Sequence, residues 1–251
     1  MIVTFLGTGT SHGIPVIGCS CRVCTSRNPK NTRWRSAVHI REGKDSLLID
    51  TPQELRLQVI RAGITNLTGV LYTHGHADHL FGIDDLRVFS RTKPLPVYAD
   101  KQTLEEIRST FAYIFKPQRQ GGGIPDLLLK RVEHHRVFAG THRVIPVPVY
   151  HGRRMITGYR IGGFAYITDC SQLPEMSRKL LADLDVLVIG ALRYRRHVTH
   201  YSVEEALEII DQLSPRIAYF THMCHDIEHQ ELEDMLPDTV RPAYDGLSIQ
   251  I

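Results

Sequence analysis

The seven residues Thr73 to His79, THGHADH, constrain this chain more than any other stretch. Three imidazoles and one carboxylate fall within six positions, at His74, His76, Asp78 and His79. A buried strand is predicted before the motif, at 67–72, and a helix after it, at 80–90, so its side chains can converge from one loop. The first two histidines share one face of an extended segment, whereas the aspartate and the last histidine follow the turn. The spacing therefore predicts two metal ions held close together, one by each pair.

Three further candidate ligands stand at the ends of predicted strands. His151 closes VPVYHG, Asp169 closes FAYITD and His222 closes IAYFTH. A lone histidine at a strand end is more often an ordinary polar residue, but strand ends on one edge of a layered β fold share a rim. Together with the motif they complete two coordination shells. We expect His151 to join the first pair, His222 to join the second, and Asp169 to bridge the two ions through its two oxygens.

Length and charge set the broad class of the protein. At 251 residues the chain can bury one large core. Its net charge of +3 suits an anionic substrate but does not indicate a protein that coats nucleic acid. The start, MIVTFLGTGT, has no basic region ahead of its short apolar run, and no apolar stretch reaches membrane length. We therefore expect a cytoplasmic protein that associates with no membrane and does not bind nucleic acid stably.

A second metal-binding pattern lies near the start of the chain. Three of the five cysteines, Cys19, Cys21 and Cys24, form C-x-C-x-x-C in a basic loop with few apolar residues. Thiolates at this spacing chelate zinc, although a tetrahedral site needs a fourth ligand from elsewhere. The alternatives are three small buried residues or a redox pair. Zinc is favoured because such a loop needs a clip to order it.

The remaining pattern alternates strands with helices, which favours two sheets covered by helices on their outer faces. One helix is expected to begin with Thr51 as N-cap and Glu54 as its reciprocal partner, and to end at Gly63. Another is expected to begin with a capping box formed by Ser202 and Glu205. No repeat or linker divides the chain, so a single domain over 1–251 is expected.

The order HxHxDH, then a histidine after a strand, then an aspartate ending a strand, then a late histidine resembles the metallo-β-lactamase superfamily of binuclear metal hydrolases. The resemblance covers the whole chain. It implies an α/β fold, a four-layer αβ/βα sandwich of two mixed β-sheets flanked by helices, with the metals at one edge between the sheets.

Within that superfamily the cysteine pattern, GTGT at the first turn and THMCH near the end are similar to the PhnP-type phosphodiesterases, which act on phosphoribosyl cyclic phosphate. In that branch a histidine just beyond the last metal histidine joins the three cysteines. Here this residue is His225, and Cys224 is its rival as the fourth ligand. The resemblance thus implies a structural zinc in a loop at about 14–34.

Two divalent ions, zinc or manganese, would lower the pKa of a shared water and absorb charge on phosphoryl oxygens. The leaving oxygen needs a further group, and His200 resembles the extra, non-metal histidine of the phosphodiesterase and RNase Z branches; His197 is the competing choice. His200 and Asp78 are thus the catalytic candidates. The same loop contains Arg193, Arg195 and Arg196, which could bind substrate oxygens. They could equally form a solvated basic loop without a binding role.

We expect a phosphodiesterase that cleaves a small cyclic or diester phosphate, with this phosphate ester as its partner and a homodimer left open. An RNase Z-like nuclease or another hydrolase of the same fold is the alternative, although RNase Z carries a long arm and this chain has only a short flexible loop at 118–124. The third hypothesis is a catalytically silent metal-binding module. The presence of all seven ligand residues argues against it. Asp50, at the end of SLLID, is either a hydrogen-bond acceptor that orients a ligand histidine or a turn residue.

Overall fold

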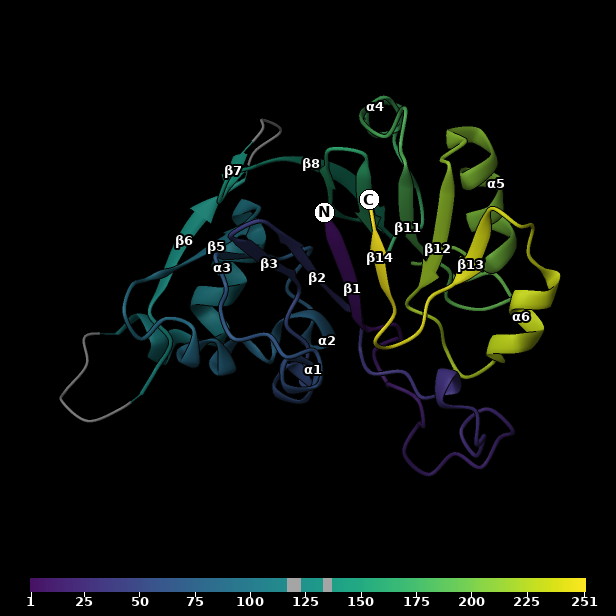
Figure 1. Ribbon diagram of the computed structural model, residues 1–251, viewed down its shortest axis with the longest axis horizontal. Helices are drawn as coiled ribbons and strands as arrows, with labels where there is room; N and C mark the ends of the chain where they lie inside the picture. The colour runs from purple at the N-terminus through teal and green to yellow at the C-terminus, as the bar shows by residue number, and fades with distance from the viewer. Residues whose placement is uncertain (117–122, 133–136) are drawn as a thin grey trace.

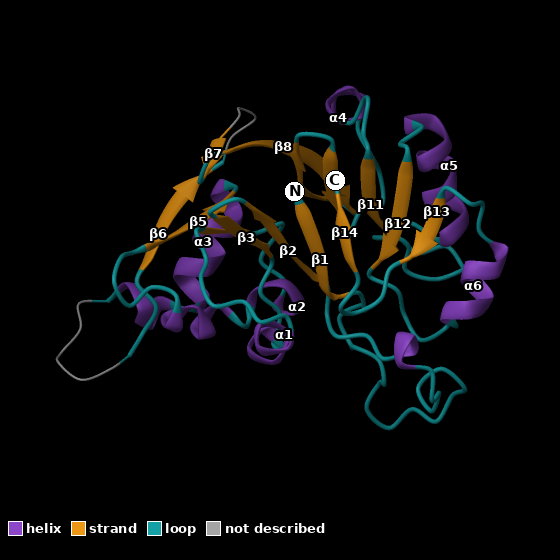
Figure 2. Cartoon of the chain, viewed as in Figure 1, coloured by secondary structure: helices purple, strands orange, loops and turns teal. Residues whose placement is uncertain are grey.

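The computed structural model describes residues 1–116, 123–132 and 137–251, and these form two seven-stranded sheets with helices on their outer faces (Figures 1 and 2). The expected αβ/βα sandwich is confirmed. Most of the loop expected at 118–124 lies outside the described residues. None of the described helices combines the length and the apolar character needed to span a membrane.

Each sheet mixes parallel and antiparallel strands. The first sheet contains, in spatial order, β14 (Ser248–Gln250), β1 (Ile2–Gly7), β2 (Ala37–Glu42), β3 (Asp45–Ile49), β4 (Gly69–Leu71), β5 (Leu95–Ala99) and β6 (Leu127–Arg131). The second contains β13 (Val240–Pro242), β12 (Ile217–Thr221), β11 (Val186–Gly190), β10 (Phe164–Ile167), β9 (Arg154–Ile161), β8 (His142–His151) and β7 (Val137–Ala139). The α-helices are α1 (Leu55–Arg61), α2 (Ala77–Leu80), α3 (Lys101–Thr110), α4 (Glu175–Leu180), α5 (Val203–Leu213) and α6 (His229–Met235), with 3-10 turns at Pro29–Asn31, Ile83–Val88 and Ala112–Phe115.

Apolar side chains fill three layers of this sandwich. Residues such as Phe5 and Ile49 of the first sheet pack with Tyr159 and Phe164 of the second to form the central core. Two further clusters lie between each sheet and its own helices. All five residues of β11 are buried, as expected for a strand covered on both faces. The strand ends that border the central core are therefore held rigidly.

The beginning of the first helix differs from the prediction. Helix α1 begins at Leu55, and the Thr51 side chain does not cap it. The Thr51 hydroxyl instead bonds to the Tyr72 hydroxyl at 2.7 Å, and Glu54 forms an ion pair with Arg35. Tertiary partners thus replaced the expected local cap. Its end at Gly63, with φ of +64°, is confirmed.

The bounds predicted for the helix at 80–90 are also wrong. Helix α2 begins inside the motif, at Ala77, and ends at Leu80, and a separate 3-10 turn follows. A Cβ at Gly82 would lie 2.2 Å from the carbonyl oxygen of Pro52, so this glycine permits the close approach of two backbones that interrupts the helix. Asp78 and His79 consequently project from a short helix. The capping box of Ser202 and Glu205 at α5 is confirmed.

Candidate metal centre

The seven histidines and aspartates expected to bind two metals come together at one edge of the two sheets. They form two groups that share Asp169: His74, His76, His151 and Asp169 in one, and Asp78, His79, Asp169 and His222 in the other. Within each group the candidate ligand atoms lie within 4.8 Å of one another. The structure thus brings together all seven residues in the two sets that the sequence predicted, while metal binding itself stays a prediction.

The distances around Asp169 fit two coordination shells. Oδ1 lies 3.3 Å from His79 Nε2 and 3.2 Å from His222 Nδ1, whereas Oδ2 lies 3.8 Å from His74 Nε2. Nitrogen and oxygen ligands about 2.0–2.2 Å from one tetrahedral ion are separated by roughly 3.4 Å. Each carboxylate oxygen therefore faces a different group, which is the arrangement of a bridging ligand.

Hydrogen bonds on the outer side of the rings orient the histidines. His79 Nδ1 lies 2.7 Å from Asp50 Oδ2 and donates to it, because a carboxylate oxygen accepts. Thr73 donates its hydroxyl to the same oxygen at 2.8 Å, so the hydroxyl can accept from His74 Nδ1 at 3.0 Å. Asp50 therefore orients His79 directly and His74 through Thr73. This is the role of a hydrogen-bond acceptor for ligand histidines that the sequence suggested for Asp50.

The inner nitrogens of these rings have no hydrogen-bond partner. Buried and unpaired atoms in the described part of the chain include His74 Nε2, His79 Nε2 and His222 Nδ1, all of which point toward Asp169. Unpaired polar atoms in a buried site carry a free-energy cost that a bound cation would remove. The donor set of imidazoles and carboxylates suits zinc, manganese or iron(II), so the residues present fit the metals that the sequence implies.

Strained backbone marks the same place. Asp50, Asp169 and His222 adopt positive φ angles of 66°, 52° and 57°, and they account for three of the five non-glycine residues in that region of conformational space among the described residues. Such conformations cost of order 1 kcal/mol or more and persist where surrounding structure enforces them, commonly at functional sites. Aspartate and histidine adopt positive φ more readily than most residues, but the sequence does not tell which of them do so.

Burial and mutual charge shift the pKa values in this centre in opposite directions. Burial lowers the pKa of His74 and of His222. Burial also acts against the charged form of His79, but the surrounding carboxylates outweigh it and raise that pKa. Asp169, although fully buried, has a lowered pKa because His222 and His79 favour its charged form. The centre thus keeps an ionised Asp169 beside His74 and His222, whose lowered pKa values favour the neutral imidazoles that metal ligation requires.

His200 lies against this centre, and His197 lies farther out. The His200 ring stacks on His222 at a centroid distance of 5.1 Å and an interplanar angle of 15°, and its Nδ1 is 3.9 Å from Asp169 Oδ2. Its ring centroid is also 4.7 Å from that of His151. Burial lowers the pKa of His200 to about 3, so its imidazole is neutral at pH 7. Of the two candidates, His200 is the one that lies against the clustered histidines and Asp169.

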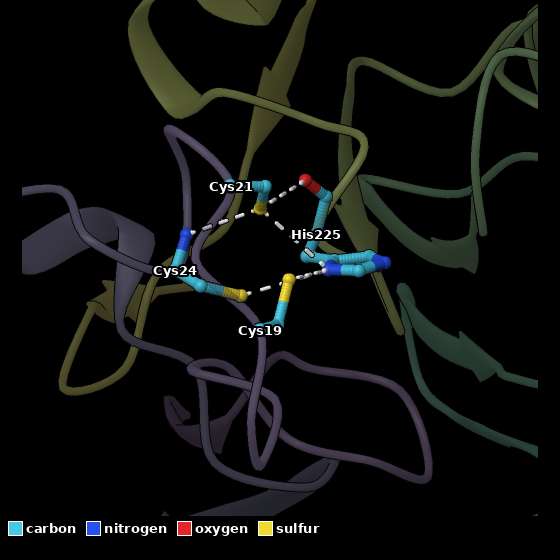
Figure 3. A group of neighbouring side chains, drawn as sticks. All are labelled: Cys19, Cys21, Cys24 and His225. Atoms are coloured by element: carbon cyan, nitrogen blue, oxygen red, sulfur yellow. Dashed lines mark hydrogen bonds between the residues drawn. The ribbon is translucent and has the colours of Figure 1, made fainter.

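The cysteine loop projects beyond the ends of the sheets, and its three thiols meet His225 (Figures 1 and 3). His225 Nδ1 lies 3.3 Å from Cys19 Sγ, 3.7 Å from Cys21 Sγ and 3.5 Å from Cys24 Sγ. Sulfur and nitrogen ligands at about 2.3 and 2.0 Å from a tetrahedral zinc are separated by roughly 3.5 Å. The four side chains thus have the spacing of a closed zinc site.

The rival ligand Cys224 points elsewhere. Its sulfur accepts the backbone N–H of Asp226 and takes no part in the group of four. Among the clustered thiols, the hydrogen bond from the Cys24 N–H to Cys21 Sγ lowers the pKa of Cys21 to about 7. Burial raises the pKa of Cys24 to about 11. The geometry favours His225 over Cys224 as the fourth ligand.

The three arginines of the 193–196 loop make protein contacts. Arg193 donates to the carbonyl oxygens of Arg195 and Arg196, and so stabilises its own loop. Arg195 pairs with Asp226 at 3.6 Å and Arg196 with Glu205 at 3.4 Å, and both side chains are largely exposed. A role in holding substrate therefore remains a proposal.

A cavity of about 330 Å³ adjoins His200 and contains residues that sequence analysis did not single out. It is lined in part by Ser11 and His12 from the turn after β1, by Arg193 and by His225. His12 carried no motif, and only the approach of the β1 turn to the arginine loop places it there.

Comparisons with known proteins agree with this architecture. Residues 46–223 match the model of the β-lactamase superfamily domain family. A solved structure described as a new diphosphatase from the PhnP family is 37% identical, with a TM-score of 0.94 over 100% of this chain and 97% of the other. The zinc-bound PqqB of Methylobacterium extorquens shares the fold, with a TM-score of 0.80 and 17% identity over the full length of both chains.

A curated relative named octanoyltransferase, from Porphyromonas gingivalis, is 37% identical over 246 residues, which are 96% of this chain and 50% of the relative. The chain thus spans about half the length, or less, of the curated relatives it matches. The family match covers the strand ends that carry the clustered histidines and aspartates, and the match to the PhnP-family structure covers the entire sandwich. The chain therefore belongs to the metallo-β-lactamase superfamily and is similar to its PhnP-type members.

Proposed function

We propose that this chain is a metal-dependent hydrolase that cleaves small phosphate diesters, including cyclic ones, or diphosphates. The observation that carries the proposal is the pair of His/Asp groups sharing Asp169, with His200 stacked beside them. Two cations in these groups would supply an activated water and stabilise the anionic charge that gathers on phosphoryl oxygens. The similarity to a PhnP-family diphosphatase supports phosphorus over carbon as the centre attacked.

The chain's own residues then have distinct tasks. Asp169 and the surrounding histidines hold the centre at one edge between the sheets, and Asp50 fixes the rings. His200 is neutral at pH 7, so it assists the leaving oxygen by donating an N–H hydrogen bond as negative charge develops there. This contribution should be greatest for a poor leaving group such as an alkoxide.

Acyl transfer is the competing activity, since a longer relative is named octanoyltransferase. Transfer through a thioester on the chain would need a reactive thiolate. Cys170, the residue after Asp169, is buried and its pKa is raised to about 12, so it stays a protonated thiol. This chain corresponds to one half of that relative, and the other half could carry the transfer.

The test is a substrate panel with a matched variant. Purified chain loaded with zinc or manganese is assayed on a ribose cyclic phosphate, a nucleoside diphosphate ester, a precursor transfer RNA and an octanoyl thioester. We expect turnover of one of the first two, a fall of about 100-fold or more in His200→Ala, and unchanged metal content in that variant. Octanoyl transfer or transfer-RNA cleavage without turnover of the small phosphates would overturn the proposal.

A further inference from the structure

The turn that leads into His200 is closed by the side chain of His197. The Thr199 backbone N–H lies 3.3 Å from His197 Nδ1, and the Thr199 hydroxyl lies 3.1 Å from the same atom. A backbone N–H can only donate, so Nδ1 accepts and the ring proton resides on Nε2. An acceptor on residue i that takes the N–H of residue i+2 is the hydrogen bond that asparagine and aspartate form in Asx-turns.

This turn carries two groups of the metal centre. The Thr199 carbonyl lies 2.8 Å from His151 Nδ1, and because a carbonyl only accepts, the proton of His151 is on Nδ1 and its Nε2 is free to bind a metal. The next residue is His200, which stacks against His222. A single turn therefore orients one candidate ligand and the leaving-group residue.

Close contacts on both sides keep the turn in register with the strand ends. A Cβ on Gly152, the residue after His151, would lie 2.9 Å from the Thr199 methyl group, so the two loops touch directly. On the other side of His200, the Tyr201 N–H donates to the carbonyl of Cys170, which follows Asp169, at 2.7 Å. A shift of Thr199 would consequently be transmitted to His151 and to His200.

We propose that His197 is a positioning residue, whose ring acceptor holds Thr199 and through it both the orientation of His151 and the place of His200. This goes beyond the proposed hydrolase activity, because it assigns a role to the second histidine of the loop. His197 lines the same cavities as His200 and could otherwise be a proton donor or a substrate contact. The effect on His200 rests on the proposed function, whereas the effect on His151 concerns metal retention alone.

Two substitutions at one position separate these roles. His197→Ala removes the acceptor, whereas His197→Asn keeps an acceptor for the i+2 N–H but cannot act as an imidazole acid. We expect His197→Ala to retain metal about 10-fold more weakly in a competition with a chelator, as for other residues that orient ligands, and His197→Asn to stay within about threefold of wild type. Val198→Ala, which alters an exposed side chain in the same turn, is the control and should retain metal normally.

Activity gives the second readout. With an alkyl phosphodiester, kcat should fall about 10- to 100-fold in His197→Ala and recover in His197→Asn, and the loss should be smaller with a 4-nitrophenyl leaving group, which needs less help from His200. If His197→Asn is as impaired as His197→Ala, His197 acts through its own ring and the proposal is wrong. Normal metal retention and kcat in both variants would also overturn it. If wild type cleaves no phosphate ester, the proposed function fails, and the chelator competition still decides the role of His197 at His151.

Discussion

The two clusters of metal-binding side chains in this protein are built in different ways. The His/Asp centre takes its residues from strand ends of the second sheet and from the loop and short helix α2 that follow β4 of the first. Except for His76, the seven are buried, and hydrogen bonds to Asp50, Thr73 and Thr199 orient three of its rings. The cysteine cluster takes three of its four residues from Cys19–Cys24, in a loop whose own apolar cluster contains little more than Ile14 and Val23.

The fold positions the His/Asp centre, whereas the cysteine cluster orders the loop that carries it. Rigid strand ends and outer hydrogen bonds fix the His/Asp centre before any ion is present, so removing a ligand there should cost function and little stability. The cysteine loop lacks a core that could order it, so its ion should contribute stability and only indirectly affect catalysis. Four predictions test this contrast, from the largest expected effect to the smallest.

Asp169→Asn should abolish most activity while leaving the fold intact. Because the residue faces both groups, its loss removes several kcal/mol of metal-dependent transition-state stabilisation, which corresponds to a fall in kcat/KM of about 1000-fold or more. Asparagine tolerates the positive φ at this position, so Tm should change by only a few degrees. Asp183→Asn, at an exposed positive-φ position, is the matched control. Retained activity in Asp169→Asn would contradict a shared carboxylate.

Cys21→Ser should show the opposite pattern. We expect a loss of about one zinc per chain and of about 3 kcal/mol of stability, a part of what structural zinc contributes in small domains. This corresponds to a fall in Tm of roughly 6–12 °C. Metal analysis and thermal unfolding provide the measurements, and the remaining metals should stay bound. Cys224→Ser should keep its zinc; if it loses the zinc instead, the assignment of His225 is wrong.

Asp245 anchors the segment after the cysteine loop to the turn after β1, and it should make stability depend on pH. It accepts the Thr8 hydroxyl at 2.8 Å and the Trp34 N–H at 2.6 Å, and burial raises its pKa to about 7. Since the folded-state pKa lies above the ordinary value, the folded state binds more protons, and its stabilisation is complete below about pH 4 and lost as pH rises through 7. Between pH 4.5 and 7.5 the wild type should lose about 3 kcal/mol relative to Asp245→Asn.

Urea unfolding at both pH values measures this difference, with Asp238→Asn as a surface control. Parallel pH profiles for the wild type and Asp245→Asn would show that the carboxyl is ionised in the folded state across this range, with a pKa near its ordinary value. The anchor of the cysteine loop would then make no pH-dependent contribution to stability.

Thr73→Val should have the smallest effect. It breaks the link from Asp50 to His74 but leaves the direct bond from Asp50 to His79. Metal affinity should fall about 10-fold for one ion, the lower end for outer hydrogen-bond partners, with the second ion unaffected. Stepwise metal titration measures the two affinities, and Thr4→Val on the outer part of β1 is the control. Equal weakening of both ions would show that Asp50 and Thr73 act on the centre as one unit.

Much of the site was readable from the sequence because metal chemistry limits which residues can gather. The HxHxDH spacing, three polar residues at strand ends and the C-x-C-x-x-C loop were each visible locally. The structure brings together these ten side chains and also His225, which the family resemblance implied. The layered fold was also predictable, since the apolar periodicity of strands and helices is a property of short segments.

The failures have a common physical cause. Thr51 satisfies a capping pattern yet bonds to Tyr72, and the helix after the motif breaks at Gly82 because another backbone passes within contact. The sequence likewise does not tell which of its aspartates and histidines adopt the positive φ angles seen at Asp50, Asp169 and His222. In each case, partners distant in sequence supplied interactions stronger than the local preference.

The sequence by itself therefore predicted most of the residues that gather in the two clusters, because ligand type and spacing are encoded locally. Only the tertiary structure decided how they are held. It set the two oxygens of Asp169 toward different groups, placed His200 rather than His197 against the centre, and turned His225 rather than Cys224 toward the thiols. Orientation depends on hydrogen bonds and backbone angles that exist only when strands far apart in the chain meet.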